Sequence, residues 1–183
     1  MNYLVIVNKD NKLDRTYIPD DLVDTNSRYK DNVLVRKEVL DSFNRMAMDA
    51  KMQGYDIDIM SGYRDYLYQE KIYNKLVLEK GFAYAFRRVA KAGCSEHQTG
   101  LAIDICVYKD NKCYIEQEIE EMDEGKWLED NAYKYGFILR YPRGLEDITG
   151  YNYEPWHLRY LGINLATELY ERGITLEEYY GEY

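Results

Sequence analysis

The middle of the chain is a hairpin-like segment, and it limits the folds that the chain can adopt. Residues 101–107 have the composition of a buried strand, and residues 112–115 of a partner strand across the turn Lys109-Asp110-Asn111. A turn this short joins antiparallel strands, whereas parallel strands need a long crossover. Hairpins are more evident than β-α-β crossovers along the chain, so we expect an α+β fold. The sheet should be small, mainly antiparallel and flanked by helices.

The remaining elements follow from apolar spacing and from the residues that start and stop helices. Further strands are expected at 3–7, 55–60, 137–139 and 156–160, and residues 20–32 are expected to be irregular. Helices are expected at 36–53, 65–79 (with Asp65 as its cap), 83–91, 124–135, 162–171 and 175–180. No repeat, low-complexity tract or linker divides the sequence, which predicts one domain over residues 1–183.

The composition of the chain argues against some classes of binding partner. The net charge of −9 argues against binding to nucleic acid or to anionic membrane surfaces, but not against small peptides. No apolar run approaches the roughly 18 residues of a membrane span. The first nine residues carry no secretory signal, so we expect a cytoplasmic protein, or one whose leader is missing from this sequence. Three cysteines without CxxC spacing also suit the cytoplasm, although a Cys106–Cys113 bridge stays open.

Both histidines of the chain lie next to acidic residues. His97 belongs to a segment that ends at Asp104, and His157 follows Glu154 by three residues. A catalytic zinc ion needs three protein ligands of this kind and one open position. His97 and Asp104 could meet one metal if the chain turns back at Gly100. Spacing alone leaves a metal site and two structural histidines equally open.

Three segments together resemble the signatures of the VanY-type D,D-carboxypeptidases, which are zinc peptidases. They are 61–64 (Ser-Gly-Tyr-Arg), 95–104 (the SxHxxGxAxD pattern) and 154–157 (Glu-Pro-Trp-His, the ExWH pattern). The similarity covers nearly the whole chain and is greatest to the VanXY group of vancomycin-resistance enzymes. That group combines D,D-dipeptidase and D,D-carboxypeptidase activity and lacks a secretion signal. The resemblance implies a hedgehog- or D,D-peptidase-like fold.

The resemblance also assigns roles to the matching positions. It implies that His97, Asp104 and His157 bind Zn²⁺ and that Glu154 is the general base. A carboxylate in that place can take a proton from water and pass it to the leaving amine. Arg64 matches the family arginine that polarises the scissile carbonyl group, a role that suits a permanently charged guanidinium.

Substrate contacts are assigned less sharply. Ser95 and Gln69 are candidates for holding the terminal carboxylate of the substrate, and Ser61, Tyr63 and Trp156 complete the candidate set. Trp156 is expected to act mainly by positioning the histidine that follows it. Ser61 stands where dipeptide-cleaving relatives often carry an aspartate that pairs with the substrate amine, which puts the dipeptidase activity in question.

The expected function is hydrolysis of the terminal D-Ala-D-Ala bond in peptidoglycan precursor peptides, with a possible link to vancomycin and other antibiotic resistance. Two alternatives use the same fold, an L,D-carboxypeptidase and a phage-type wall endopeptidase. A third is a zinc-stabilised binding module without catalysis, which would not need Glu154 and Arg64. Oligomeric state is not indicated by the sequence.

Overall fold

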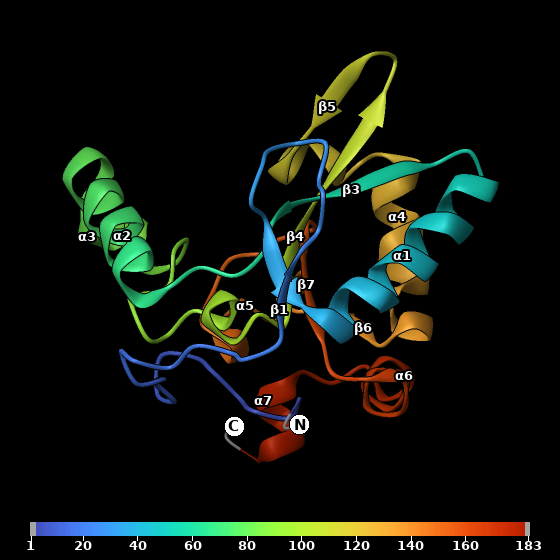
Figure 1. The fold of residues 1–183 in the computed structure, drawn as a ribbon. Helices are drawn as coiled ribbons and strands as arrows, with labels where there is room; N and C mark the ends of the chain where they lie inside the picture. Colours follow the sequence, from blue (N-terminus) through green and yellow to red (C-terminus); the bar gives the residue numbers. More distant parts are fainter. Residues whose placement is uncertain (1–2, 182–183) are drawn as a thin grey trace.

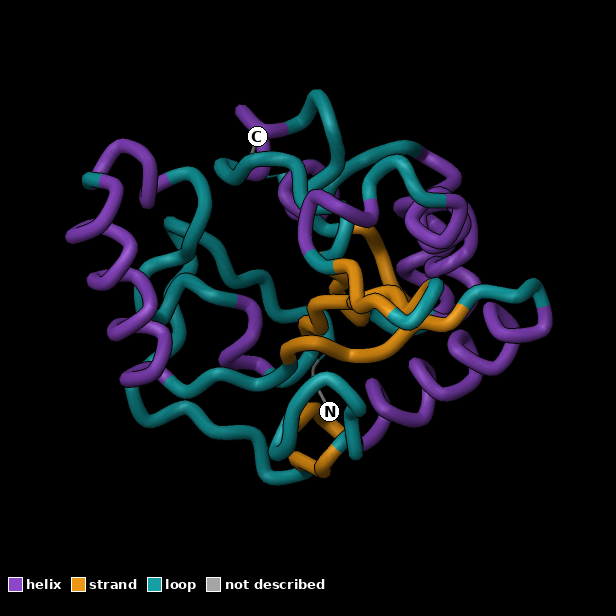
Figure 2. The backbone as a smooth tube through the Cα atoms, turned by 90° about the horizontal axis from the view of Figure 1, so that it is seen from above, coloured by secondary structure: helices purple, strands orange, loops and turns teal. Residues whose placement is uncertain are grey.

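A computed structural model describes residues 3–181 and has the expected α+β class, with one antiparallel sheet between groups of helices (Figures 1 and 2). The central sheet has the order β3-β4-β7-β6, and β5 pairs with the outer part of β4. A separate two-stranded ribbon joins β1 and β2. The strands are β1 (Leu22–Asp24), β2 (Leu34–Arg36), β3 (Asp56–Ser61), β4 (Ala102–Lys109), β5 (Lys112–Tyr114), β6 (Phe137–Leu139) and β7 (His157–Tyr160).

The helices lie on opposite sides of this sheet. Figures 1 and 2 both place α1 and α2 far apart, with the strands between them. The α-helices are α1 (Lys37–Met52), α2 (Tyr66–Lys80), α3 (Phe82–Phe86), α4 (Asp123–Asn131), α5 (Glu146–Thr149), α6 (Ile163–Arg172) and α7 (Leu176–Tyr180). The 3₁₀ helices are η1 (Glu96–Thr99), η2 (Glu116–Ile119) and η3 (Ala132–Tyr135).

Strand alternation separates an apolar face of the sheet from a polar one. On β4 the side chains of Ile103 and Ile105 join the main hydrophobic core, together with Leu158 of β7. The buried face of α1, which includes Phe43 and Met46, packs into the same core. Because neighbouring residues of a strand point to opposite faces, Asp104 and His157 must emerge on the other side. The apolar core thus sets the direction of two candidate metal ligands.

The local signals for the two long helices are confirmed. α1 begins after Arg36 and ends at Met52, within a residue of the expected bounds. α2 is capped by Asp65, whose side chain accepts a hydrogen bond from the backbone N–H of Tyr68 at 2.7 Å. Such a cap satisfies an N–H group that the helix itself leaves without a partner.

The expected strand at residues 3–7 is wrong. The structure has no strand at residues 3–7, and two carbonyl groups of this segment bind a buried side chain. Arg159 donates from Nη2 to the backbone oxygens of Tyr3 and Val5, at 3.0 and 2.6 Å. A guanidinium here replaces the ladder of hydrogen bonds that a neighbouring strand would supply.

Three other boundaries also differ from the expectation. Residues 20–32 are not wholly irregular, because β1 lies within them and pairs with β2. The helix expected at 83–91 is only the short α3 and ends at Phe86, where Arg87 caps it. The helix expected at 124–135 divides into α4 and η3, with the change at Ala132.

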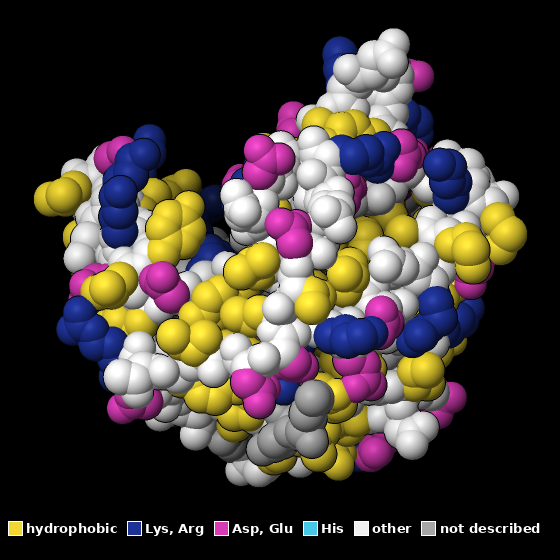
Figure 3. Space-filling model, in the orientation of Figure 1, with side chains coloured by type: hydrophobic (Ala, Val, Ile, Leu, Met, Phe, Trp, Pro, Cys, Tyr) yellow, Lys and Arg dark blue, Asp and Glu magenta, His cyan; other side chains and the backbone are white. Residues whose placement is uncertain are grey.

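The molecule is hollowed between the α2–α3 segment and the sheet, with basic side chains visible inside the hollow (Figure 3). Residues on both sides line it, including Gln69 of α2 and Asp104 of β4. Among residues 3–181, no helix has the length and apolar character that a membrane crossing requires. Cys94, Cys106 and Cys113 are free thiols. The cytoplasmic location expected from the sequence stays a prediction.

Candidate active site

Two neighbouring strands bring a carboxylate and an imidazole together. Asp104 of β4 lies directly opposite His157 of β7 in the antiparallel register. Side chains of such opposed pairs lie on one face of the sheet within contact distance. His157 Nδ1 is accordingly 3.2 Å from Asp104 Oδ1.

The third group, His97, comes from η1, immediately before β4. Its Nε2 lies 3.3 Å from Asp104 Oδ1, and its Nδ1 donates to the backbone oxygen of Gly62 at 2.7 Å. Since a carbonyl can only accept, the proton of a neutral His97 is on Nδ1, and Nε2 keeps its lone pair for the cluster. Gly100 adopts a left-handed φ of 68°, which turns the chain from η1 into β4. A glycine is also required at Gly62, because a Cβ atom there would lie 2.2 Å from the backbone oxygen of Leu34.

The His97–Asp104–His157 cluster fits a zinc ion. One possible ligand atom from each residue lies within 4.8 Å of the others, and all three residues are buried. Within the described residues, His97 Nε2 and Asp104 Oδ1 have no hydrogen-bond partner, although buried polar atoms normally have one. Two imidazoles and one carboxylate are a donor set that zinc accepts at catalytic sites. A cation at this point would complete the bonding of these atoms.

A carboxylate and a guanidinium lie beside the cluster. Glu154 Oε2 lies 3.6 Å from His157 Nδ1, and the backbone N–H of Glu154 donates to the oxygen of Tyr141. Arg64 Nη2 lies 3.6 Å from Asp104 Oδ2, while Arg64 Nε has no hydrogen-bond partner among the described residues. Both side chains therefore keep polar atoms free for a further group.

Burial shifts the pKa values of these groups in different directions. Burial raises the pKa of Glu154 to about 8, with the nearby Asp104 adding to the effect. It lowers the pKa of His97 to about 4, so this ring is neutral near pH 7. For His157, burial is outweighed by the carboxylates of Asp104 and Glu96, which raise its pKa to about 9. Binding of a metal requires this proton to leave.

These groups line one cavity of about 150 Å³. Besides the cluster, it is lined by the predicted residues Arg64, Gln69, Ser95, Glu154 and Trp156. It continues into a second cavity of about 260 Å³. Residues that line both are Arg88, Val89, Glu116, Glu154 and Trp156.

Only some of the residues predicted to contact substrate line this cavity. Gln69 is buried and donates from Nε2 to the backbone oxygen of Ala90, while its Oε1 has no partner in the described chain. Ser61 and Tyr63 line a different surface cavity, which shares only Arg64 with the first. Their predicted contact with substrate stays a prediction.

Sequence reasoning missed several residues around the cluster. Tyr141 packs against the His157 ring at 4.8 Å between centroids, and Glu96 lies behind that ring. Arg88 and Glu116 place opposite charges where the two cavities join. Glu116 has a left-handed φ of 51°, an uncommon conformation for a residue with a side chain.

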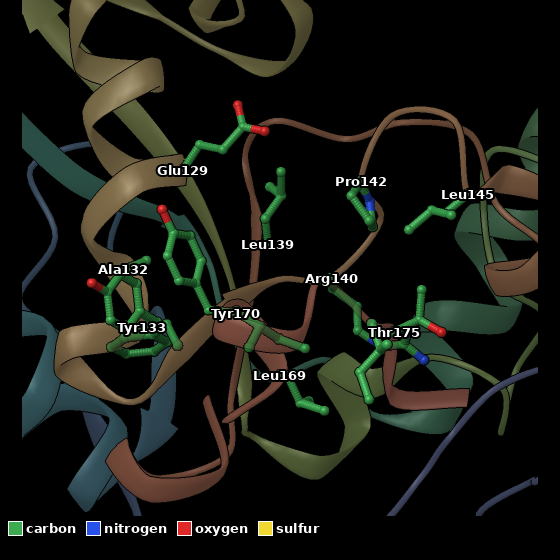
Figure 4. A pocket seen from close by; sticks show the side chains of 14 residues that line it. Glu129, Ala132, Tyr133, Leu139, Arg140, Pro142, Leu145, Leu169, Tyr170 and Thr175 are labelled. Atoms are coloured by element: carbon green, nitrogen blue, oxygen red, sulfur yellow. The ribbon is translucent and has the colours of Figure 1, made fainter. Parts of the chain in front are cut away.

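Another cavity, of about 250 Å³, lies away from the cluster and is shown in Figure 4. Its walls include Leu139, Pro142, Leu169 and the stacked rings of Tyr133 and Tyr170. It contains none of the three candidate ligands. The smaller cavity, which the three candidate ligands line, is therefore the candidate active site.

Comparison with known proteins shows the family of the chain. The sequence model of the family described as VanY, D-alanyl-D-alanine carboxypeptidase, matches residues 32–163. The carboxypeptidase candidate YodJ of Bacillus subtilis (strain 168) is 44% identical over 98% of this chain and 67% of its own length. The bifunctional D-Ala-D-Ala dipeptidase and carboxypeptidase VanXYC of Enterococcus gallinarum is 35% identical, over 98% of this chain and 94% of its own.

Solved structures show the same fold. The L,D-carboxypeptidase LdcB has a TM-score of 0.90 at 43% identity, over 98% of this chain and 86% of that one. The D,D-pentapeptidase VanY from a VanB-type resistance cassette, solved as a point mutant in complex with Zn(II), has a TM-score of 0.83 at 33% identity. That alignment covers 97% of this chain and 98% of the other. The fold class expected from the sequence is thereby confirmed.

Proposed function

This chain belongs to the VanY family of D-alanyl-D-alanine carboxypeptidases, and on that basis we propose that it is a zinc peptidase that removes the C-terminal D-alanine from peptidoglycan stem peptides. The observation that carries the proposal is the meeting of three metal-binding side chains, a carboxylate and an arginine in one buried cavity. A binding module without catalysis would have no use for the last two.

The proposed zinc ligands are His97 through Nε2, His157 through Nδ1 and Asp104 through Oδ1. Support comes from His97 Nε2 and Asp104 Oδ1, which have no hydrogen-bond partner among the described residues, and from the Zn(II) complex of the VanY relative. When bound, an ion of this kind polarises a carbonyl group and lowers the pKa of water toward about 7. The protein holds the ligands before metal arrives, because Gly62 orients one ring and the strand register orients the other two side chains.

In the proposed mechanism, Glu154 transfers the proton and Arg64 stabilises charge. We propose that Glu154 Oε2 accepts a proton from the attacking water. It later donates this proton to the leaving amine. Its place beside His157, in the wall of the cavity, suits a group that both takes and returns a proton there. We assign to Arg64 the stabilisation of the negative charge that develops on the scissile carbonyl oxygen.

The two joined cavities suggest how a peptide lies. The smaller cavity, beside Gln69 and Ser95, is suited to a terminal residue as small as alanine. The larger one, beyond Trp156, can receive the preceding residues. Within the described chain, the Glu116 carboxylate has no ion-pair partner, so it is free to bind a substrate amine. Glu116 would then supply the carboxylate that dipeptide-cleaving relatives carry at the position of Ser61.

Two substrates are compatible with these cavities. The family and VanXYC favour the pentapeptide stem, whose last bond joins two D-alanines. The high similarity to LdcB favours the tetrapeptide stem, whose last bond joins an L-centre to D-alanine. We place the pentapeptide first, and the tetrapeptide is the second candidate.

The experiment is a parallel digest of the UDP-linked pentapeptide, the tetrapeptide and free D-Ala-D-Ala, followed by mass spectrometry. Release of D-alanine from the pentapeptide is expected, with the tetrapeptide as product. Further trimming to the tripeptide would show L,D-activity, and loss of the free dipeptide would show dipeptidase activity. A pentapeptide and a tetrapeptide that both keep their terminal D-alanine after digestion with the zinc-loaded protein would overturn the proposal.

Arg64→Ala is expected to retain zinc and to lower kcat by about 10²–10³-fold, because the arginine acts on charge in the transition state. Zinc content and kcat should be measured on the same preparation. Arg28→Ala is a matched control, since Arg28 pairs with Asp56 and Asp58 and does not line the active-site cavity. Equal kcat in the two variants would remove Arg64 from the mechanism.

A further inference from the structure

A buried carboxylate lies behind the active site and connects it to the rest of the fold. The Glu96 side chain is fully buried. Its Oε1 accepts hydrogen bonds from Arg140 Nε at 2.8 Å and from Arg159 Nη1 at 2.7 Å. Both guanidinium groups are themselves buried, so this oxygen is fully occupied and held from two directions.

The other oxygen of Glu96 faces a proposed zinc ligand. Glu96 Oε2 lies 3.7 Å from His157 Nε2, the nitrogen on the far side of the ring from Asp104 and Glu154. Neither atom has a hydrogen-bond partner among the described residues. The two atoms therefore face each other without another hydrogen-bond partner in the described chain, and a small movement of the ring would close the bond.

We propose that Glu96 is a positioning residue that accepts the Nε2–H of His157 and thereby presents Nδ1 to the metal. A histidine that binds a metal through one nitrogen usually donates the other N–H to a carboxylate or carbonyl oxygen. His97 already has such an arrangement with Gly62. Glu96 supplies the same restraint to His157, and the two arginines fix Glu96 in turn. This inference rests on the proposed zinc site.

The buried charges around Arg140 also provide a control variant. Glu177 of α7 is also buried and binds Arg140 through two hydrogen bonds, but within residues 3–181 it forms no ion pair with His157. Glu96→Gln and Glu177→Gln each remove one negative charge from around Arg140. Only Glu96→Gln removes the acceptor that faces the metal ligand. A glutamine has one acceptor and one donor group, so it cannot satisfy the arginines and His157 together.

The first measurement is zinc affinity, by competition with a chromophoric chelator. Glu96→Gln should weaken zinc binding by about 10–100-fold, the usual cost of losing a partner of a metal-bound histidine. Glu177→Gln should lower thermal stability while its zinc affinity stays near that of the wild type. Equal weakening in both variants would show a role in stability alone and would overturn the proposal.

The second measurement reads the position of the proton directly. The chain has two histidines, so ¹⁵N-histidine NMR of the zinc-loaded protein gives two resolvable rings. We expect Nδ1–H for His97 and a protected Nε2–H for His157. Glu96→Gln should expose only the His157 proton to exchange, with His97 as the internal reference. An unchanged His157 signal would contradict the proposal.

Two outcomes separate the inference from the proposed function. Wild-type protein that binds no zinc would refute the zinc site itself. Wild-type protein that binds zinc no more tightly than Glu96→Gln would refute only the role of Glu96. Should Glu96→Gln fail to fold, Glu96→Asp keeps the charge between the arginines. Its side chain is one methylene shorter and cannot also reach His157, so the same loss of zinc affinity is expected.

Discussion

Glu154→Ala is expected to lower kcat by about 10²–10⁴-fold and to leave the bound zinc in place. The reason is that Glu154 is assigned the moving proton and is not one of the three ligands. Removing it leaves His97 on η1 and Asp104 and His157 on their strands. Steady-state release of D-alanine and metal analysis of the same sample measure both quantities.

Glu124→Ala is a suitable control for the loss of a buried carboxylate. Glu124 is 2% exposed and pairs with Lys109 at 3.1 Å, away from the active-site cavity. This variant should lose stability and keep kcat. If Glu154→Ala kept most of its activity, or lost zinc, its assignment as the proton carrier would be wrong.

His157→Ala is expected to lose zinc and activity together, because this residue is proposed to hold the ion itself. Zinc should also cease to stabilise the variant. For the wild type, a ligand at a thousandfold excess over its Kd adds about 4 kcal/mol to the free energy of unfolding. Thermal unfolding with and without zinc measures this difference.

The comparison between the two variants separates a ligand from a base. Glu154→Ala should keep the zinc-dependent rise in Tm, and His157→Ala should lack it. A His157→Ala protein that still bound one zinc per chain with the wild-type affinity would exclude His157 from the metal site.

Local signals in the sequence were sufficient for much of the fold. The apolar spacing of α1 and the cap at Asp65 depend on residues within one or two turns of helix, so both can be predicted from the local sequence. The motif residues Asp104 and His157 were predicted to meet, and the strand register places them opposite each other. The direction of both side chains follows from alternation with Ile103 and Leu158 in the core.

The remaining features depend on contacts between distant parts of the chain. The expected strand at 3–7 failed because Arg159, at the other end of the sequence, binds its carbonyl oxygens. The partners of Glu96 are 44 and 63 residues distant, so no local pattern could reveal that it faces His157. The cavity walls at Arg88 and Glu116 likewise arise only when the segment after α3 and the start of η2 come together.

The most direct test of the zinc-peptidase account is a metal titration that follows D-alanine release. Protein stripped of metal by a chelator should not hydrolyse its stem peptide. Activity should return in proportion to added zinc and reach its maximum at one zinc per chain. Full hydrolysis by protein shown to contain no metal would contradict the account.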